Sequence, residues 1–310
     1  MDIKIPRRYQ RIARLLTTAE LQEPDSSEAL LSEKDLFELN IGARSDGLFL
    51  GFYSKKGLIN ALTRYSIVKS LNELGFHDLI FEINTNDPYI HRLVIYDSKK
   101  ASNRLLIEAV LRRRTVEIQM PFRTSLNGRH YETLAIEWLC MQNPEKSFSK
   151  KRPQLPGQQF PGLGMASKAV EILLITAWRL HLAGLLNTPD HYHNAYLYSR
   201  IFYYLNPDHQ AWFEALKRDL KNYPLHVVSW AIEWNLVIDK KQGKPLEWIA
   251  GQQIVPLNRN LKKLFASKEY RNYVRGKSKS FKFSLDYDKY KQMELAGGKH
   301  EAQSHSITKR

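Results

Sequence analysis

The pattern of hydrophobic and polar positions divides the chain into a strand-rich first half and a helix-rich second half. Four segments of the first half are rich in Ile, Val, Leu and aromatic residues and are separated by turn sequences such as NTNDP and SLNGRH, which is typical of strands. The third of them begins with LLIEAVL, whose spacing also fits a helix, but we favour a strand. A short apolar segment bounded by glycine, GLFLGFY, predicts one more strand. The predicted strands cover residues 47–53, 78–84, 91–97, 105–120 and 132–141.

Helical spacing dominates most of the remaining chain. Apolar residues recur every three or four positions from Lys56 to Gly75, where the glycine supplies a helix stop. Four prolines make the segment 143–162 a loop, because proline can continue neither a helix nor a central strand. Beyond this loop the predicted helices cover residues 165–183, 191–204, 209–223, 225–239 and 257–274, with a short strand at 185–187.

These elements predict an α/β (α+β) fold, in which a mixed, mostly antiparallel sheet is flanked by helices and followed by a helical, basic C-terminal extension. In the polar N-terminal segment, Ser32 and Asp35 have the spacing of a capping box, which indicates a helix start. We expect four parts: an N-terminal helical and polar segment at 1–46, the core at 47–207, a helical extension at 208–275 and a basic, partly disordered tail at 276–310.

Composition narrows the class of protein. The 310 residues are 43% hydrophobic and 11% aromatic, which allows a substantial core and excludes a wholly disordered chain. Cys140 is the single cysteine, so no intramolecular disulfide can form, and this fits a reducing compartment. No apolar stretch approaches the roughly 18 residues of a membrane-spanning helix, and the first residues lack the apolar block of a secretory signal. We therefore expect a cytoplasmic protein with no membrane contact.

Positive charge is concentrated near the C-terminal end. The chain carries a formal net charge of +15, and residues 257–310 hold 14 Lys and Arg against 5 Asp and Glu. A segment of this kind is most often a solvated extension, and it can also attract polyanions in a salt-dependent way. Contact with nucleic acid or another polyanion through residues 257–310 is therefore one expectation from the charge.

The most informative short stretch is GQQFPGLGMASKAVEILLITAWRL at residues 157–180, where two glycines precede the most regular helical pattern of the chain. A glycine turn that leads into a helix exposes main-chain N–H groups at the positive end of the helix dipole, and such a point binds phosphate. The stretch has neither the lysine and hydroxyl residue of a nucleoside-triphosphate P-loop nor the third glycine of a dinucleotide fingerprint. The alternative is a plain turn that enters a buried helix in an ordinary α/β domain.

The order of segments after this stretch is similar to that of a known family. Residues Gln159 to Gly164, QFPGLG, fit the pattern Gln/Arg-x-x-Gly-x-Gly/Ala, and HYHNAYLYSRIFYYLNP follows the next short strand. Over residues 132–204 the chain resembles the GNAT superfamily of acyl-CoA-dependent N-acyltransferases. The resemblance implies an enzyme that moves an acetyl or other acyl group from acyl-CoA to a small-molecule or protein amine, without a metal.

The resemblance also implies roles for individual residues. In the family, main-chain amides of the glycine stretch hold the coenzyme A pyrophosphate, and the end of a splayed strand supplies backbone donors to the pantetheine arm and thioester. Tyr198 would be the general acid that protonates the leaving thiolate, and Glu137 the candidate base for the amine, with Glu132 or a water chain as alternatives. The implied cofactor-binding residues are Leu139, Cys140, Met141, Gln159, Phe160, Gly162, Leu163, Gly164, Met165 and Asn194.

Three features depart from the family pattern. The loop between the strand at 132–141 and Gln159 is longer than usual. Phe202 and Tyr203 stand where Gly-Phe is common, and Ala195 lies one residue closer to the tyrosine than usual. The final strand pair of the family is not visible, because helices are predicted after residue 207.

Other chemistry-bearing residues have ordinary structural interpretations beside functional ones. Cys140 could act as a nucleophile, although a small buried strand residue is the more common case. Asp190, His191 and His193 could suggest a metal site, but neighbours at i and i+2 diverge on a helix. The run at 112–114, Arg-Arg-Arg, is typical of a solvated edge and could also meet a 3′-phosphate or an acidic acceptor. The alternative function is a nucleic-acid-binding or assembly protein that uses the basic C-terminal region on a catalytically silent GNAT-like scaffold.

Overall fold

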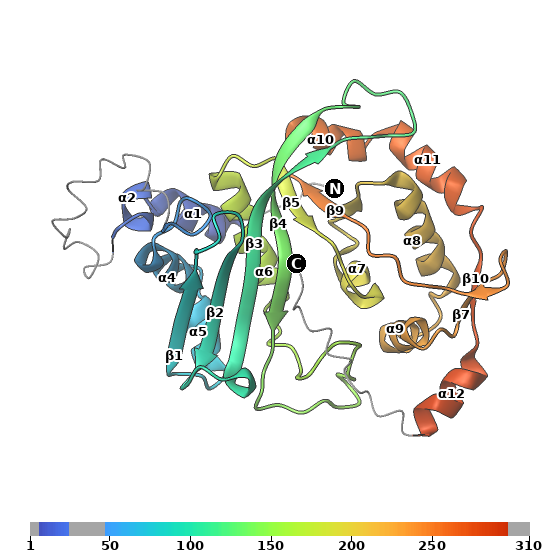
Figure 1. The fold of residues 1–310 in the computed structure, drawn as a ribbon, viewed down its shortest axis with the longest axis horizontal. Coiled ribbons are helices and arrows are strands. Elements are labelled where there is room, and N and C mark those ends of the chain that lie inside the picture. Colours follow the sequence, from blue (N-terminus) through green and yellow to red (C-terminus); the bar gives the residue numbers. More distant parts are fainter. Residues whose placement is uncertain (1–5, 25–46, 297–310) are drawn as a thin grey trace.

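The structure is a computed structural model that describes residues 6–24 and 47–296. The described residues form a seven-stranded sheet in the order β1-β2-β3-β4-β5-β9-β6 and a three-stranded sheet in the order β10-β7-β8. Helices flank the large sheet, so the predicted mostly antiparallel α+β architecture is confirmed (Figure 1). The strands are β1 (Leu79–Asn84), β2 (His91–Asp97), β3 (Leu105–Glu117), β4 (His130–Met141), β5 (Gly184–Asn187), β6 (Tyr203–Tyr204), β7 (Val237–Asp239), β8 (Lys244–Pro245), β9 (Gln253–Pro256) and β10 (Phe283–Leu285).

The described residues also form helices. None of them is long and apolar enough to cross a membrane. They are α1 (Arg7–Leu15), α2 (Thr18–Leu21), α4 (Lys55–Arg64), α5 (Ile67–Glu73), α6 (Ala166–Arg179), α7 (Tyr192–Tyr198), α8 (Pro207–Asp219), α9 (Leu225–Glu233), α10 (Arg259–Phe265), α11 (Lys268–Ser278) and α12 (Tyr287–Leu295), with a short 3-10 helix, η2, at Ser102–Arg104.

Strand pairing in the large sheet is antiparallel except at one place. The strands β1 to β4 form an antiparallel meander, because short connections join neighbouring strands. Its register shifts between Ile95 and Tyr96 of β2 and between Val110 and Leu111 of β3. The pair β4 and β5 is parallel, since the chain crosses from one to the other through α6. The strand β9 then lies between β5 and β6 and is antiparallel to both.

Buried residues fall into three clusters that explain how the helices cover the sheet. The main cluster joins α1, α4, α5 and α6 to one face of the sheet, where it includes Leu134, Leu185 and Val255. The third cluster joins α10 and α11 to the opposite face, through Ala135, Leu186 and Ile254. Successive residues of a strand point to opposite faces, so these neighbours divide between the two clusters.

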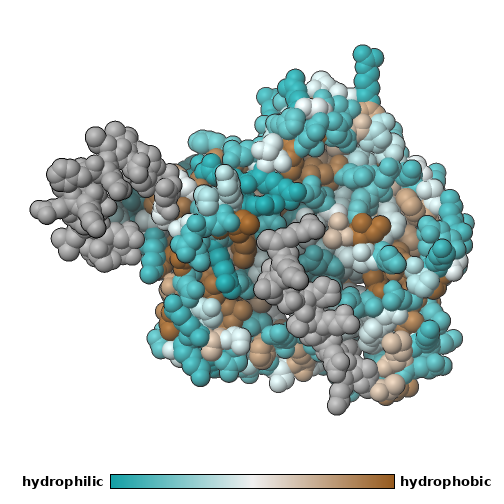
Figure 2. Space-filling view, in the orientation of Figure 1, coloured by the Kyte–Doolittle hydropathy of each residue, from teal (hydrophilic) through white to brown (hydrophobic). Residues whose placement is uncertain are grey.

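The second cluster lies at the other end of the molecule. It joins α7, α8, α9 and α12 to the small sheet and is rich in aromatic residues, among them Tyr192, Tyr204, Phe213 and Trp230. Hydrophobic residues reach the viewed face of the molecule as separate patches among hydrophilic ones (Figure 2).

Two expectations for the first part of the core are corrected. Residues 47–53 form turns around an isolated bridge between Phe49 and Tyr53 instead of a strand. The helix expected from Lys56 to Gly75 is two helices, α4 and α5, because Ser66 adopts a left-handed conformation with φ of 62°. The side chains of Phe49, Leu50 and Tyr53 are nevertheless buried, so the apolar pattern correctly indicated core positions.

The second half of the chain shows further differences from the predicted helices. The helix expected at 165–183 ends at Arg179, and the one expected at 191–204 ends at Tyr198, before β6. The segment 225–239 ends in a strand, β7, and 257–274 is divided between α10 and α11.

The expected division of the C-terminal half differs from the structure in one respect. The predicted helical extension at 208–275 contributes β9 to the large sheet, so it is not a separate helical layer. Residues 276–296 contain the end of α11, β10 and α12, whereas residues 297–310 and the predicted capping box at Ser32 lie outside the described residues. A capping box is present elsewhere, between Thr17 and Glu20 at the start of α2.

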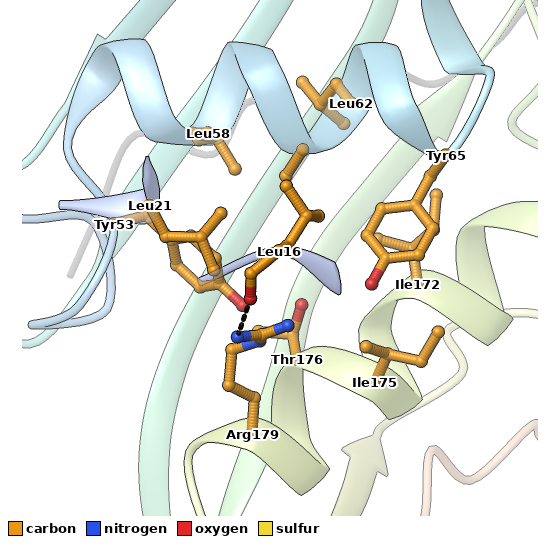
Figure 3. A pocket seen from close by; sticks show the side chains of 11 residues that line it. Leu16, Leu21, Tyr53, Leu58, Leu62, Tyr65, Ile172, Ile175, Thr176 and Arg179 are labelled. Carbon is orange, nitrogen blue, oxygen red and sulfur yellow. Dashed lines mark hydrogen bonds between the residues drawn. The ribbon is translucent and has the colours of Figure 1, made fainter. Parts of the chain in front are cut away.

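The N-terminal helices are attached to α6 through one arginine. The guanidinium of Arg179 donates to the carbonyl oxygens of Ala13, at 2.6 Å, and Leu16, at 3.1 Å, where α1 ends. Figure 3 shows the bond to Leu16. The last carbonyls of a helix have no intrahelical partner and carry partial negative charge, so a cation stabilises them. Arg179 lines a pocket together with Tyr53 and Tyr65. Burial raises the pKa of Tyr65 to about 12.

The closest backbone approach in this region occurs at Gly57 of α4. A Cβ atom at this position would lie 2.0 Å from the carbonyl oxygen of Leu21. A side-chain rotation cannot remove this clash, because the atom that is too close belongs to the backbone. We expect Gly57→Ala to lower the free energy of unfolding by about 1–3 kcal/mol, the usual cost of overpacking. Urea unfolding measures the change.

Gly276, a residue of α11, is the matched control for this substitution. A Cβ atom there would meet no atom within 4 Å, so Gly276→Ala should stabilise the protein by about 0.5–1 kcal/mol. Equal effects of the two substitutions would contradict the close approach of α4 to Leu21.

Candidate functional site

The strand β4 separates from β5 after three paired residues. Leu134 to Ile136 pair with Leu185 to Asn187, and no described residue continues the pairing on this side of β4 until Gln142. A bulge lies at the same point, because Val110 pairs with Trp138 and Leu111 with Ile136, which leaves Glu137 without an opposite residue. Bulges redirect a strand and occur often beside active sites. The bulge therefore accounts for the place where β4 leaves β5.

The separation leaves one edge of β4 without strand partners. Gln142 donates its N–H to Leu106 of β3 at 2.9 Å, and main-chain groups along a strand point alternately to its two sides. The N–H and C=O of Leu139 and the N–H of Met141 therefore point away from β3, toward the gap. The unpaired edge, residues 137–140, is roughly 13 Å long at 3.3 Å per residue. An extended ligand can add to such an edge through main-chain hydrogen bonds.

The glycine stretch, residues 162–165, lies at the end of this gap where β4 finishes. Gly162 forms an isolated bridge with Gln142, in which Leu163 donates its N–H to the Met141 carbonyl at 3.3 Å. Burial alternates along this stretch. Leu163 and Met165 are buried in the main cluster, whereas Gly162 and Gly164 are exposed. The two apolar side chains thus anchor the backbone and leave the glycines at the surface.

Several main-chain amides of this stretch have no protein acceptor. Within the described residues, nothing accepts from the N–H groups of Gly162, Gly164 and Met165, and no side chain caps the start of α6. Gly164 has φ of 77°, a left-handed conformation that favours glycine. Leu163 is the exception among the amides predicted to bind phosphate, since its N–H is used by Met141. The free amides lie at the positive end of the α6 dipole.

Tyr198 is the last residue of α7 and is half-buried. Its ring packs against the main cluster, which also includes Leu163, and lies edge-on to Phe202 with ring centroids 6.1 Å apart. Burial raises the pKa of Tyr198, and no described residue forms a hydrogen bond with its hydroxyl. The phenol therefore keeps its proton at neutral pH and has a free donor. Asn194, half-buried, lies one helical turn earlier on α7.

The other predicted site residues on β4 are placed as follows. Glu137, at the bulge, forms an ion pair with Arg112 of β3, with 2.5 Å between Nε and the carboxylate. Cys140 is half-buried, and burial raises the pKa of its thiol to about 11. The thiol is thus protonated at neutral pH, which weakens the interpretation of Cys140 as a nucleophile. Gln159, exposed, and Phe160, half-buried, lie in the loop before the glycines.

Sequence reasoning missed a row of buried polar side chains that begins where β4 leaves β5. Asn187, Gln253 and Tyr204 are directly opposite one another on β5, β9 and β6, so their side chains share one face. Gln253 is completely buried, and beyond its contact with the Tyr204 hydroxyl its side chain has no hydrogen-bond partner. The Asn187 carbonyl has none within the described residues. Burial raises the pKa of Tyr204, an effect that nearby Gln253 partly offsets.

Two histidines, His193, which is buried, and His209, which is half-buried, lie on α7 and α8. His193 of α7 stacks on His191, and His209 of α8 stacks on Tyr204 with ring centroids 4.2 Å apart. Burial lowers the pKa of His193 to about 3 and that of His209 to about 4, so both rings are neutral at physiological pH. No group of three or more metal-binding side chains occurs within residues 6–24 and 47–296.

The polar row had one weak sequence signal, the glutamine pair that precedes the apolar residues of QQIVP. This signal could not identify the row, because the sequence did not predict β9 as a strand. Comparison with known proteins finds no matching family model, no matching curated protein and no matching solved structure.

The amide of Gln253, which has no hydrogen-bond partner beyond the Tyr204 hydroxyl, leads to a stability prediction. Replacing a buried polar group that lacks most of its partners by an apolar one of similar shape removes a desolvation cost, so Gln253→Met should raise the free energy of unfolding by about 1–2 kcal/mol. Urea unfolding checks the direction.

A matched control is Gln210, which is also buried but has hydrogen-bond partners. Its carbonyl accepts from Tyr204 N–H at 2.8 Å and its amide donates to Glu214 at 2.9 Å. Gln210→Met should lower stability by about 1–3 kcal/mol, because Tyr204 N–H loses its acceptor. A loss of stability in Gln253→Met would mean that ordered water satisfies that amide.

The neutral histidines lead to a prediction for pH. A histidine with a lowered folded-state pKa binds its proton more readily in the unfolded chain, so its stabilising contribution is complete above pH 6.5 and decreases as pH falls. Each of His193 and His209 should reduce the free energy of unfolding by up to about 1.4 kcal/mol per pH unit below that point.

Urea unfolding between about pH 7 and about pH 5 measures this slope, a range in which histidines titrate and most carboxylates do not. The double substitution His193→Gln and His209→Gln should flatten the profile. If the double variant has the same slope as the unaltered chain, the two rings take up protons as readily in the folded protein as in the unfolded chain, which would contradict the lowered pKa values.

Proposed function

We propose that this chain is an acyl-CoA-dependent N-acyltransferase that transfers an acyl group directly from the thioester to an amine. The observation that carries the proposal is the unpaired edge of β4 between the pairing with Asn187 and the Gly162 bridge, which ends beside the free amides of Gly162, Gly164 and Met165. This arrangement is the one implied by the resemblance to the GNAT superfamily.

The site has separate places for the two parts of the coenzyme. The amides of Gly162, Gly164 and Met165, together with the first turn of α6, suit the pyrophosphate, because N–H donors and the helix dipole attract an anion. The N–H and C=O of Leu139 and the N–H of Met141 suit the amide groups of the pantetheine arm, which is a polar, extended chain. The loop and the strand edge are adjacent, since Gly162 and Gln142 pair directly.

The chemistry needs one proton donor and one proton acceptor. The amine nitrogen attacks the thioester carbonyl carbon, the C–S bond breaks, and the departing thiolate takes a proton from the Tyr198 hydroxyl. The nitrogen gives up one proton to water, and Tyr198 regains its proton from solvent. The products are an amide and free coenzyme A, so atoms and charge balance.

Water is the proton acceptor that we propose for the amine. Glu137 forms an ion pair with Arg112, and Glu132 lies 3.7 Å from Arg113, so both carboxylates expected as bases have a guanidinium partner on β3.

Isothermal titration with coenzyme A and with acetyl-CoA tests the proposal. We expect binding to the full chain and a decrease of about 100-fold or more in affinity for Gly162→Glu, because the new carboxylate repels the diphosphate and covers the amides. Gly276→Glu is the matched control, since it adds the same charge at an exposed position with open space around it. Absence of binding to the unaltered chain would overturn the proposal.

A kinetic measurement separates the role of Tyr198 from binding. Tyr198→Phe removes the hydroxyl and keeps the ring in the main cluster, so kcat should fall about 100-fold while coenzyme affinity changes little. The turnover assay follows free thiol released from acetyl-CoA in the presence of a panel of amines. Loss of coenzyme affinity in the same variant would indicate a structural role for the hydroxyl instead.

A further inference from the structure

A second candidate site lies at the opposite end of the β3-β4 hairpin. The loop 118–129 connects these two strands, and it forms a pocket with α10 and the start of α11. Leu139 and His130 are nine positions apart on β4, which is roughly 30 Å at 3.3 Å per residue. The pocket is therefore distinct from the acyltransferase site.

The loop that forms one wall is held in a defined conformation. Asn127 accepts from Met120 N–H at 2.8 Å and donates to the Met120 carbonyl at 3.1 Å, so its side chain closes the loop. Leu126 is buried in the third cluster, and the ring of Phe122 contacts Tyr273 of α11 with centroids 6.0 Å apart. The hairpin tip and α11 thus form one continuous surface.

The pocket carries unbalanced positive charge. Arg123 and Arg129 come from the loop and Lys263 from α10, and none of their side chains has an ion pair or a hydrogen bond with a described residue. Glu269 is the single acidic residue that lines the pocket. Asn260 and Ser267 add neutral polar groups to its wall.

Positive charge continues from the pocket over the two helices. From residue 257 to residue 282, Glu269 is the single acidic residue. Basic side chains at the surface of this segment are Arg259, Lys262, Lys263, Lys268, Arg271, Arg275, Lys277, Lys279 and Lys282. One of them, Lys277, forms an ion pair, with Asp208 at 3.5 Å. Mostly hydrophilic residues cover the upper right of the molecule, where Figure 1 places α10 and α11 (Figure 2).

We infer that this surface, made of the loop 118–129 and helices α10 and α11, binds the phosphodiester backbone of a nucleic acid. The pocket has the donors for one phosphate group, and the cations that extend from it over two helices match a ligand whose negative charge repeats along a chain. A small phosphate compound would engage the pocket and leave the flanking cations without a partner. The inference does not depend on the proposed acyltransferase activity.

Fluorescence anisotropy of the full chain with a labelled DNA duplex of about 20 base pairs, and with an RNA strand of similar length, tests the inference. We expect binding whose affinity falls as the salt concentration rises. The double substitution Arg123→Glu and Lys263→Glu should weaken binding about 10-fold or more and reduce the slope of log K against log salt by about two, one for each phosphate contact that is lost.

The matched control is the double substitution Lys55→Glu and Lys99→Glu. Both lysines are exposed, belong to α4 and the turn after β2, and give the same change in net charge. It should change affinity by less than about 3-fold, because these residues lie outside the proposed surface. Equal losses in the two double variants would mean that net charge alone attracts the nucleic acid, and the inference would fail.

Two further measurements complete the test. Inorganic pyrophosphate that binds in a manner sensitive to Arg123→Glu, while neither oligonucleotide binds, would identify a small-phosphate site and overturn the inference. A folding control completes the test for the double variant Arg123→Glu and Lys263→Glu. If coenzyme A binds the unaltered chain, equal coenzyme A affinity of the variant shows that the variant is folded. If coenzyme A does not bind, an unchanged thermal unfolding midpoint of the variant gives the same information.

Discussion

The parallel pairing of β4 with β5 stops after Ile136, and the arrangement of the candidate site depends on this one interruption. Inside a sheet, each main-chain N–H and C=O finds a partner on the neighbouring strand. The bulge at Glu137 turns β4 away, so the groups of Leu139 and Met141 are left to other partners. Met141 C=O is used by Leu163, which fixes the glycine stretch at the end of the gap. The interruption thus creates a strand edge and positions free amides beside it.

The surrounding core keeps this edge in place. Leu163 and Met165 insert into the main cluster while Gly162 and Gly164 remain exposed, so apolar packing helps to hold the free amides in position. On β9 and β6, the side chains of Gln253 and Tyr204 are buried and have no hydrogen-bond partner beyond each other, although most buried polar groups are satisfied. Polar groups that reduce stability in this way are a common feature of functional sites.

The long hairpin of β3 and β4 separates two kinds of surface. One end of β4 lies beside the glycine stretch, where the donors are main-chain amides. The other end carries the loop 118–129, where the donors are arginine and lysine side chains of the loop and α10. Both favour anions, but amides at a helix terminus suit a single phosphate or diphosphate, whereas distributed cations suit a polyanion.

Much of the fold followed from local patterns in the sequence. The strands at 78–141 were predicted because their side chains are rich in β-branched and aromatic residues between clear turns, and the glycine stretch before α6 was identified by residue type and order alone. Short elements were decided by tertiary structure. The four residues of β9 become a strand because β5 and β6 supply its hydrogen bonds and both faces are buried. The buried polar row around Gln253, the ion pair of Glu137 and the joining of loop 118–129 to α10 and α11 depend on contacts between residues far apart in the chain, which a local pattern cannot encode.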